Sequence, residues 1–390
     1  MIHIVAFDVP FPPDYGGAID VFYKIKALHA TGVKITLHCF TYRDRQAQSV
    51  LETFCEKVFY YKRRTGFFSH LSKMPYIVKS RKHPDLLKNL CADNTPILFE
   101  GLHTCAFIDH PSLEQRKKMV RMHNIEWQYY EHLALAEKKI FSKKYFQIEG
   151  TKLKRFEEKV FFHGDIFFCI SRTEEKYFFE KNIFFSEISK KYLEKNIQKK
   201  VFEKKIIFLP PFHAEEKVIS KVGIGDYILY HGDLSVNDNV ESVKALIENV
   251  FSKINVRCIV AGKNPSRNLI GITEFFPNIK IIVNPKEQDM KNLIQNAQIN
   301  ILHTGHTSGM KLKLLHALFV GRFCFANTEM VQDTGLESLC EIYDSFDELK
   351  KMISETMDKT FEEKIISKRK KILEKKFSNS FNASKILRSI

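Results

Sequence analysis

Short apolar runs alternate with helical patterns along nearly the whole chain. In the first half, β-branched and aromatic runs occur at residues 2–7, 33–40, 96–101, 119–124 and 165–171. The segments from about 18 to 31 and from 142 to 163 instead repeat their apolar residues at helical spacing. Strand-length apolar runs that alternate with amphipathic helices predict parallel βαβ units.

This alternation breaks once and then restarts. At "IIFLPPF" (206–212) two prolines follow a strand, which indicates a hinge or linker. Apolar runs then return at 227–234, 256–265, 279–285 and 299–304, with helices near 238–251 and 287–297. We predict two doubly wound α/β domains, residues 1–210 and 211–375, and a tail, 376–390, that returns to the first domain. A ligand is expected at the carboxyl ends of the strands, in the cleft between the domains.

Composition places the chain among cytoplasmic globular proteins. Of its 390 residues, 44% are hydrophobic and 27% are charged, as in ordinary soluble domains. No apolar run approaches the roughly 20 residues that span a bilayer, and "MIHIVAFDVPF" reads as a first strand because it lacks the basic start of a signal peptide. The eight cysteines are scattered without a C-x-x-C pair, so we expect reduced thiols and neither a disulfide framework nor a zinc site.

The net charge of +15 is uneven, because residues 1–210 carry +12 of it. A basic half would suit nucleic acid, anionic lipid or a phosphorylated acceptor, but the Lys-, Phe-, Ile- and Asn-rich composition of an AT-biased genome explains the excess equally well. No nucleic-acid motif accompanies the charge, so we expect no nucleic-acid partner. Region 176–205 interleaves Phe178, Phe179 and other apolar residues with lysines. We hypothesise a peripheral contact with an anionic membrane there; the alternative is a helix whose aromatic face packs into its own domain.

Polar and glycine residues follow several predicted strands. In the first half, Gly16 and Gly17 open a helix directly after the first strand, where backbone N–H groups accept a close ligand. The other candidates in this half end later strands: His103, His123, Asn124 and Glu126.

In the second half, the loop "HTSGMKLKLLH" opens an apolar helix. The candidates there are Gly232, Lys263, Ser308, Gly309, Lys311 and Lys313. A lysine at a helix amino end is electrostatically misplaced unless an anion is present, which favours a phosphate or diphosphate ligand over two solvated lysines. G-x-S-x-G, P-loop and H-E-x-x-H motifs are absent from the sequence, so serine hydrolase, P-loop NTPase and zinc-protease functions lack support.

Five segments in this order resemble a known family. They are "PFPPDYGGAIDVFYKIKALHATGVKITLHCF", "VRMHNIEWQYY", "DIFFCIS", "ILYHGDLSVNDNVESVKALIENVF" and "SGMKLKLLHALFVGRFCFAN". They resemble the GT-B glycosyltransferases, most closely the bacterial glycosyltransferase-family-4-like (group 1) retaining transferases. The resemblance implies two Rossmann-like domains facing across a cleft. It also implies transfer of a sugar from a nucleotide-sugar donor to an acceptor hydroxyl, with retained configuration, in bacterial glycan or polysaccharide synthesis.

The resemblance also implies roles and partners. The catalytic centre would contain His123, Gly17 and Gly16, and the acceptor side would contain His103, Asn124 and Glu126. The donor would be bound by Gly232, Lys263, Ser308, Gly309, Met310, Lys311, Lys313 and His316. The acceptor would be a glycan, lipid-linked or protein-linked, and neither a cofactor nor a metal is expected.

This sequence departs from the family pattern at four positions. Ser308 and His316 stand where the family usually has glutamates, and Asp233 and Asn239 stand where it usually has a basic pair. A histidine can still hydrogen-bond a ribose hydroxyl; the alternative is a core histidine packed among leucines.

Three other functions therefore stay open. One is a GT-B enzyme of different chemistry, an inverting transferase or a sugar-nucleotide epimerase, with Asp14 or His123 as base. The second is a non-catalytic GT-B protein, and the third is a basic polyanion-binding protein.

Overall fold

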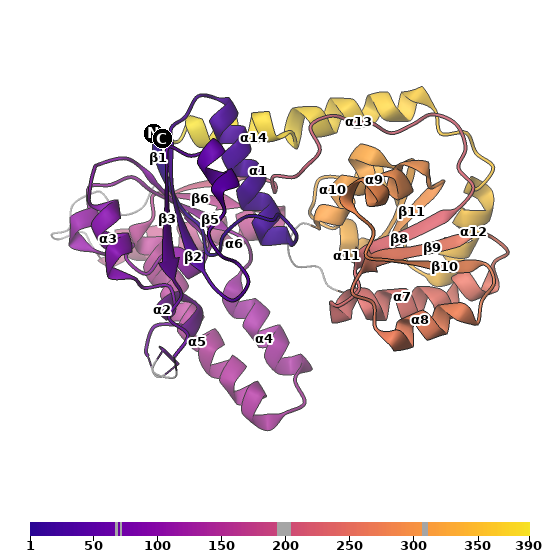
Figure 1. Cartoon of the computed structure of the whole chain (residues 1–390). Helices are drawn as coiled ribbons and strands as arrows, with labels where there is room; N and C mark the ends of the chain where they lie inside the picture. Colours follow the sequence, from indigo (N-terminus) through magenta and orange to yellow (C-terminus); the bar gives the residue numbers. More distant parts are fainter. Residues whose placement is uncertain (67–68, 71, 193–203, 306–310) are drawn as a thin grey trace. The chain divides into compact units, whose positions relative to one another are not determined.

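The computed structural model describes residues 1–66, 69–70, 72–192, 204–305 and 311–390. These form two compact units: unit 1, Met1–Ala214 with Asn379–Ile390, and unit 2, Glu215–Ser378 (Figure 1). The chain leaves unit 1 at Ala214 and not at the proline pair. The backbone N–H of Phe212 donates to Asp20 Oδ1 at 2.7 Å, and that of His213 donates to Asn379 Oδ1 at 3.1 Å. The two prolines are therefore held in unit 1.

Unit 1 is built on a parallel seven-stranded sheet in the order β3-β2-β1-β4-β5-β6-β7. The strands are β1 (Ile2–Val5), β2 (Ile35–Thr41), β3 (Lys57–Lys62), β4 (Ile97–Glu100), β5 (Lys118–Met122), β6 (Ile166–Cys169) and β7 (Lys205–Phe208). The structure confirms the strands predicted around β1, β2, β4, β5 and β6. The prediction missed β3, an edge strand with a lysine at each end and mostly half-buried side chains.

Helices cover both faces of this sheet. They are α1 (Gly16–Ala30), α2 (Tyr76–Lys79), α3 (Pro84–Leu90), α4 (Glu126–Ala136), α5 (Ile140–His163), α6 (Arg172–Tyr192) and α14 (Asn379–Leu387). On one face, Ile25 of α1 and Ile386 of α14 share a core with alternate strand residues. On the other face, Leu153 and Val160 of α5 and Phe178 of α6 form a second core.

The aromatic residues of α6 divide between the core and the surface. Phe178 is buried against Phe161 and Phe167, whereas Phe179 and Phe184 are exposed. The predicted membrane-facing stripe is therefore wrong at Phe178, which serves the core. Residues 193–203 of that region lie outside the described residues.

A chain of hydrogen bonds crosses β1, β2 and β3 inside unit 1. Asp93 accepts from His3 Nε2 at 3.0 Å, and His3 Nδ1 lies 2.8 Å from His38 Nε2. His38 Nδ1 lies 2.8 Å from the hydroxyl of Tyr61, which accepts from Asn89 Nδ2 at 2.9 Å. Burial lowers the pKa of both imidazoles and keeps them neutral. Because the Asp93 carboxylate only accepts, each bond of the chain then donates toward Asp93.

Unit 2 repeats the architecture with a parallel six-stranded sheet in the order β10-β9-β8-β11-β12-β13. Its strands are β8 (Ile228–Asp233), β9 (Cys258–Lys263), β10 (Ile279–Val283), β11 (Ile299–Leu302), β12 (Phe323–Asn327) and β13 (Glu341–Tyr343). Its helices are α7 (Asn237–Asn249), α8 (Arg267–Glu274), α9 (Glu287–Asn296), α10 (Leu312–Val320), α11 (Thr328–Val331), α12 (Phe346–Thr356) and α13 (Glu363–Lys376). Val243 of α7 and Leu349 of α12 pack in one core, and α10 buries Leu314 and Leu318. Within the described residues, none of the helices combines the length and the apolarity that crossing a membrane requires.

Candidate functional site

The carboxyl ends of β1, β4 and β5 bring three rings together in unit 1. The ring of Phe7 lies 5.5 Å, centroid to centroid, from both His103 and His123. A Cβ on Gly17 would stand 2.6 Å from Phe7 Cζ, so only glycine lets α1 begin this close to the ring. The exposed Gly16 opens the same helix. The structure thus gathers Gly16, Gly17, His103 and His123 at one edge of the sheet.

Beneath these rings lies a buried cluster of charges. Lys24 Nζ is 2.9 Å from Asp20 Oδ2 and 2.7 Å from Glu100 Oε1. Arg121 Nη2 lies 3.1 Å from Asp20 Oδ1. His123 joins the cluster through Nε2, at 3.1 Å from Glu100 Oε2, while its Nδ1 lies 4.0 Å from Asp20 Oδ2. The carboxylate of Glu100 therefore fixes the orientation of the His123 ring.

The cations of this cluster keep its carboxylates ionised. Burial alone would raise the pKa of Asp20, but Arg121 and Lys24 hold it below its usual range. Burial would likewise raise the pKa of Glu100, yet Lys24 and His123 hold it below its ordinary value. Asp20, Glu100 and His123 bring ligand atoms within 4.8 Å of one another. Because Lys24 already contacts both carboxylates, however, this triad does not fit a divalent metal ion.

His103 is a neutral imidazole in this arrangement. Burial and the nearby Arg81 lower its pKa well below the ordinary value. Its Nδ1 is buried and has no hydrogen-bond partner among the described residues. This nitrogen could therefore form a hydrogen bond with a ligand.

Glu126 and Asn124 occupy a different setting. Asn124 is half-buried after β5, and Glu126 begins α4 with its side chain buried. Burial and the Glu157 carboxylate raise the pKa of Glu126 to about 7. The charges that act on Glu126 are those of Glu157 and Arg81, so the structure does not bring its carboxyl to His123. The acceptor-side roles of both residues remain predictions.

In unit 2, glycines and lysines meet at the carboxyl ends of β8 and β9. Gly232 pairs in register with Gly262, and Asp233 pairs with the exposed Lys263. A Cβ on Gly232 would stand 3.2 Å from the side chain of Asn239, so a glycine here lets Asn239 pack closely against the end of β8. Asp233 Oδ1 accepts from the backbone N–H and the hydroxyl of Ser235 and closes the turn after β8.

Two lysines stand at the amino end of α10. Lys311 occupies the N-cap position without a side-chain capping hydrogen bond. Lys313 Nζ donates to Asn239 Oδ1 at 3.1 Å and to the carbonyl oxygen of His303 at 3.3 Å. Burial lowers the pKa of Lys313 to about 8, although Asp238 acts in the opposite direction. Burial also lowers the pKa of Lys311. A half-desolvated cation pair at a positive helix end is an arrangement that binding of an anion would stabilise.

A hollow of about 250 Å³ adjoins these lysines at the ends of β11, β12 and β13. It is lined by His303, Thr304, Gly305, Asn327, Glu329, Tyr343, Asp344, Ser345 and Phe346. The side chain of Asn327 joins β12 to β11 through hydrogen bonds with the backbone of Thr304 at 3.2 and 2.8 Å. The hollow thus offers aromatic faces together with the carboxylates of Glu329 and Asp344.

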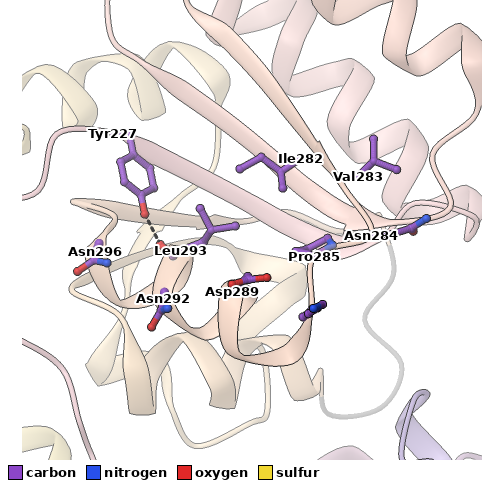
Figure 2. Close-up of a pocket in the computed structure, with 10 residues that line it drawn as sticks. Tyr227, Ile282, Val283, Asn284, Pro285, Asp289, Asn292, Leu293 and Asn296 are labelled. Carbon is purple, nitrogen blue, oxygen red and sulfur yellow. Dashed lines mark hydrogen bonds between the residues drawn. The ribbon is translucent and has the colours of Figure 1, made fainter.

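A larger hollow of about 520 Å³ lies between β10 and α9 (Figure 2). The Tyr227 hydroxyl donates to the Leu293 carbonyl oxygen at 2.6 Å across it. Strands β9 and β8 separate β10 from β11 in the sheet, and Lys313 is not among the residues that line this hollow. We place no donor group in it.

His316 lies on α10 with 29% of its side chain exposed. Its Nε2 is 3.3 Å from Glu215 Oε1, and Lys291 Nζ contacts the same carboxylate at 3.0 Å. The ring thus faces a carboxylate and His231 in addition to its helix of leucines. A contact of His316 with ribose remains a prediction.

Solved structures of known proteins match the chain over nearly its full length, whereas a curated relative matches only part of it. No family model matches it. It is 31% identical over 160 residues to an uncharacterised 44.6 kDa protein of the cps region of Klebsiella pneumoniae. This alignment covers 39% of this chain and 41% of that protein. Sucrose-phosphate synthase from Thermosynechococcus elongatus has a similar structure, with a TM-score of 0.64 and 12% identity over 99% of this chain and 97% of its own.

Two further solved structures agree. Anabaena HepE in complex with UDP and glucose gives a TM-score of 0.62 and 10% identity, over 100% of this chain and 98% of its own. Trehalose-phosphate synthase from Burkholderia xenovorans gives a TM-score of 0.59 and 10% identity, over 100% of this chain and 99% of its own. The chain has the GT-B fold. This confirms the predicted fold class, whereas the glycosyltransferase-family-4-like subgroup remains a prediction.

Within this GT-B fold, several predicted site residues lie outside the described part of the chain. They are Ser308, Gly309 and Met310. Other residues of the two edges were not predicted: Phe7, Asp20, Lys24, Glu100, Glu215, Glu329 and Asp344. Asp20 and Lys24 carried a signal, since a charged pair four residues apart interrupts the apolar face of a helix. Glu215 carried none, because only the packed fold brings it to α10. Asp344 directly follows β13, a strand that the sequence analysis did not predict.

Proposed function

We propose that the chain is a glycosyltransferase that moves a sugar from a nucleotide-sugar donor to an acceptor hydroxyl in bacterial glycan synthesis. The observation that carries the proposal is the lysine pair of α10. Lys313 is half-desolvated and hydrogen-bonded to uncharged acceptors at a helix amino end, and one of these acceptors, Asn239, packs against Gly232 at the end of β8. A donor diphosphate would supply the missing negative charge.

The donor would occupy unit 2. Its diphosphate would lie at Lys311 and Lys313, with Lys263 at the next strand end. The hollow beside them would hold hydroxyl-bearing parts of the donor, because Glu329 and Asp344 are acceptors for sugar hydroxyls. His316 would hydrogen-bond the ribose.

The acceptor would meet unit 1 at Gly17, His103 and His123. A neutral His103 with a buried, unpaired Nδ1 suits a hydroxyl group. The acceptor would be a glycan, lipid-linked or protein-linked. The eight free cysteines support a reducing, cytoplasmic location.

The chemistry proposed is retention without a metal. The leaving diphosphate would take the acceptor proton, and the protein would stabilise the leaving charge and position the acceptor. The state of three described carboxylates supports this choice, because each is already paired with a cation. Asp20 and Glu100 are neutralised by Lys24 and Arg121, and Asp14 forms an ion pair with Arg45.

One observation favours a second candidate function. His123 is oriented by Glu100 in the manner of a histidine base held by a carboxylate. That dyad would suit an inverting transferase or an epimerase. Analysis of the anomeric configuration of the product separates the two mechanisms.

The test is nucleotide binding by the full chain. We expect calorimetry to detect one nucleoside diphosphate among UDP, GDP, ADP, TDP and CDP. Lys313→Ala should weaken its binding by about 1.5–3 kcal/mol, roughly tenfold to a hundredfold. Lys286→Ala is the matched control, an exposed lysine of the β10 hollow. Equal affinity of wild type and the Lys311→Ala, Lys313→Ala double variant would refute the proposal. Affinity that collapses with salt for any polyanion would favour the polyanion-binding alternative.

A further inference from the structure

The helices α4 and α5 form a hairpin whose far end leaves the core of unit 1. They pack along each other and extend away from the sheet (Figure 1). The second half of α5 belongs to the core through Leu153 and Val160. The first half packs on α4, where the rings of Tyr130 and Phe146 meet at 5.9 Å, and Tyr145 lies 5.8 Å from the ring of His70. The tip of the hairpin, residues 135–148, is therefore held rigidly but outside the core.

This hairpin tip exposes large apolar side chains around its turn. Leu135 is 77% exposed, Ile140 81% and Phe141 92%, and Ile148 adds a fourth at 47%. Single exposed apolar residues are ordinary, but a grouped set at the end of a projecting element marks a binding surface. The fold does not need these side chains here, because they make no core contact that would explain their size.

Exposed lysines flank these apolar residues along the chain. Lys138, Lys139, Lys143 and Lys144 are exposed, and Glu137 is the one acidic residue between 135 and 148. Protein–protein interfaces are depleted in lysine. An anionic lipid surface instead attracts lysines to its headgroups while it accepts Ile and Phe at the acyl boundary.

We propose that the hairpin tip docks unit 1 onto the surface of an anionic lipid bilayer. Ile140 and Phe141 enter the interface, and the four lysines pair with headgroup phosphates. The surface differs from region 176–205, where the sequence placed a membrane contact. The proposal stands on the hairpin alone and does not depend on the donor chemistry of unit 2.

The experiment is sedimentation of the full chain with vesicles at low and high salt. One vesicle contains phosphatidylglycerol in phosphatidylcholine, and the other contains phosphatidylcholine alone. We expect binding to the anionic vesicles that weakens with salt. The double variant Ile140→Ser, Phe141→Ser should reduce the partition coefficient about tenfold or more. Phe275→Ser, which changes an 82% exposed phenylalanine of unit 2, is the matched control and should bind like wild type.

The charge is tested separately. Lys143→Gln with Lys144→Gln should reduce anionic-vesicle binding about fivefold for each lysine, whereas Lys375→Gln with Lys376→Gln on α13 should leave it unchanged. In Phe141→Trp, quenching by brominated lipid beyond that of the native Trp127 would show insertion of the tip.

Three results would overturn the proposal. The first is no binding of wild type to anionic vesicles at low salt, and the second is equal binding by the tip and control variants. The third is a tip variant that turns a dimer into a monomer without changing vesicle binding, since a second copy would then cover the tip. Melting temperatures check that all variants fold, and their nucleotide affinity should stay at the wild-type value. A failure here is thereby separated from a failure of the donor proposal.

Discussion

At the amino end of α10, the ammonium group of Lys313 is surrounded by an amide oxygen, a carbonyl oxygen and the ring of Tyr230, whose centroid is 5.3 Å away. These groups displace water from the ammonium group, but none of them is a carboxylate in direct contact that would compensate its charge. The price is a pKa of about 8. Lys313 therefore loses its charge in a pH range where the affinity for an anion can be measured.

Lys313 makes the affinity for a nucleoside diphosphate depend on pH. The lysine is charged below its pKa of about 8 and neutral above it. Since a bound diphosphate favours the charged form, affinity should be constant near neutrality and fall by up to about tenfold per pH unit above 8. Lys313→Arg keeps its charge and should remove this fall. Calorimetry on both proteins checks it, and a wild-type affinity that is equal at about pH 7 and about pH 9.5 would contradict it.

The neighbourhood of His316 decides which substitution it tolerates. Glutamate, the residue usual in the resembling family, would place a second carboxylate beside Glu215, which lies 3.3 Å from the imidazole. Like charges at this separation repel, so His316→Glu should lower the melting temperature of unit 2, and His316→Gln should not. Adding Glu215→Gln to His316→Glu should restore stability. A single glutamate variant as stable as wild type would show that the pair does not interact.

At the scale of elements, the histidine chain of β1, β2 and β3 predicts acid sensitivity. Burial, together with His3, lowers the pKa of His38 to about 3, and burial lowers that of His3. In the unfolded chain His3 and His38 both titrate near 6.5. Below that pH the unfolded state therefore binds more protons than the folded state. Stability should therefore be intact above about pH 6.5 and fall as the pH drops toward 3, by up to about 1.4 kcal/mol per pH unit for each histidine.

The measurement is urea unfolding followed by the fluorescence of Trp127, the single tryptophan, which lies in unit 1. His38→Gln should lose part of the slope between about pH 6.5 and 5, and His132→Gln, an exposed control, should keep it. The raised pKa values of Glu126 and Glu174, both about 7, act in the opposite direction. The test is thus the difference between variants, and equal slopes for wild type and His38→Gln would contradict it.

Elements whose apolar pattern is strong were predictable from the sequence. Continuous runs such as 96–101 and 165–171 correspond to buried β4 and β6, because central parallel strands bury both faces. The edge strands β3 and β13 were missed, because several of their positions are exposed and polar, and their apolar runs are therefore short or interrupted.

The candidate site divides in the same way. His103 and His123 were predictable because they follow strands, and parallel strands end at one edge; Gly17 was predictable because it opens the helix that follows the first strand. The pairing of Lys24 with Glu100, 76 positions away, and of His316 with Glu215 depends on packing that no local pattern encodes.

At the scale of the whole molecule, unit 1 is assembled from two separate stretches of chain. Ile386 and Ala383 of α14 are fully buried in the core that also contains α1. Asn379 exchanges hydrogen bonds with the backbone of His213 at 3.1 and 2.7 Å, and Lys385 donates to the carbonyl oxygen of Phe208 at 3.0 Å. These last residues are thus structural members of the first unit.

Ile386→Ala should therefore destabilise unit 1 by about 2–5 kcal/mol, the usual cost of a cavity at a buried isoleucine. The unfolding midpoint reported by Trp127 fluorescence should fall, while the nucleotide affinity of unit 2 should not. Ile353→Ala is the matched control: this isoleucine is buried in the core of unit 2 and should leave the Trp127 midpoint in place. Equal effects of the two variants on Trp127 would show that the units unfold together.

The same return of α14 sets an order for folding during synthesis. A ribosome adds residues at roughly 5–20 per second, and domains fold as their chain emerges. Unit 2 is complete once Ser378 has left the exit tunnel, but unit 1, although begun first, still lacks the helix that covers α1. The apolar surface of α1 and its sheet therefore stays uncovered until all of unit 2 has been translated. We expect chaperone binding to the nascent chain to be strongest during this interval.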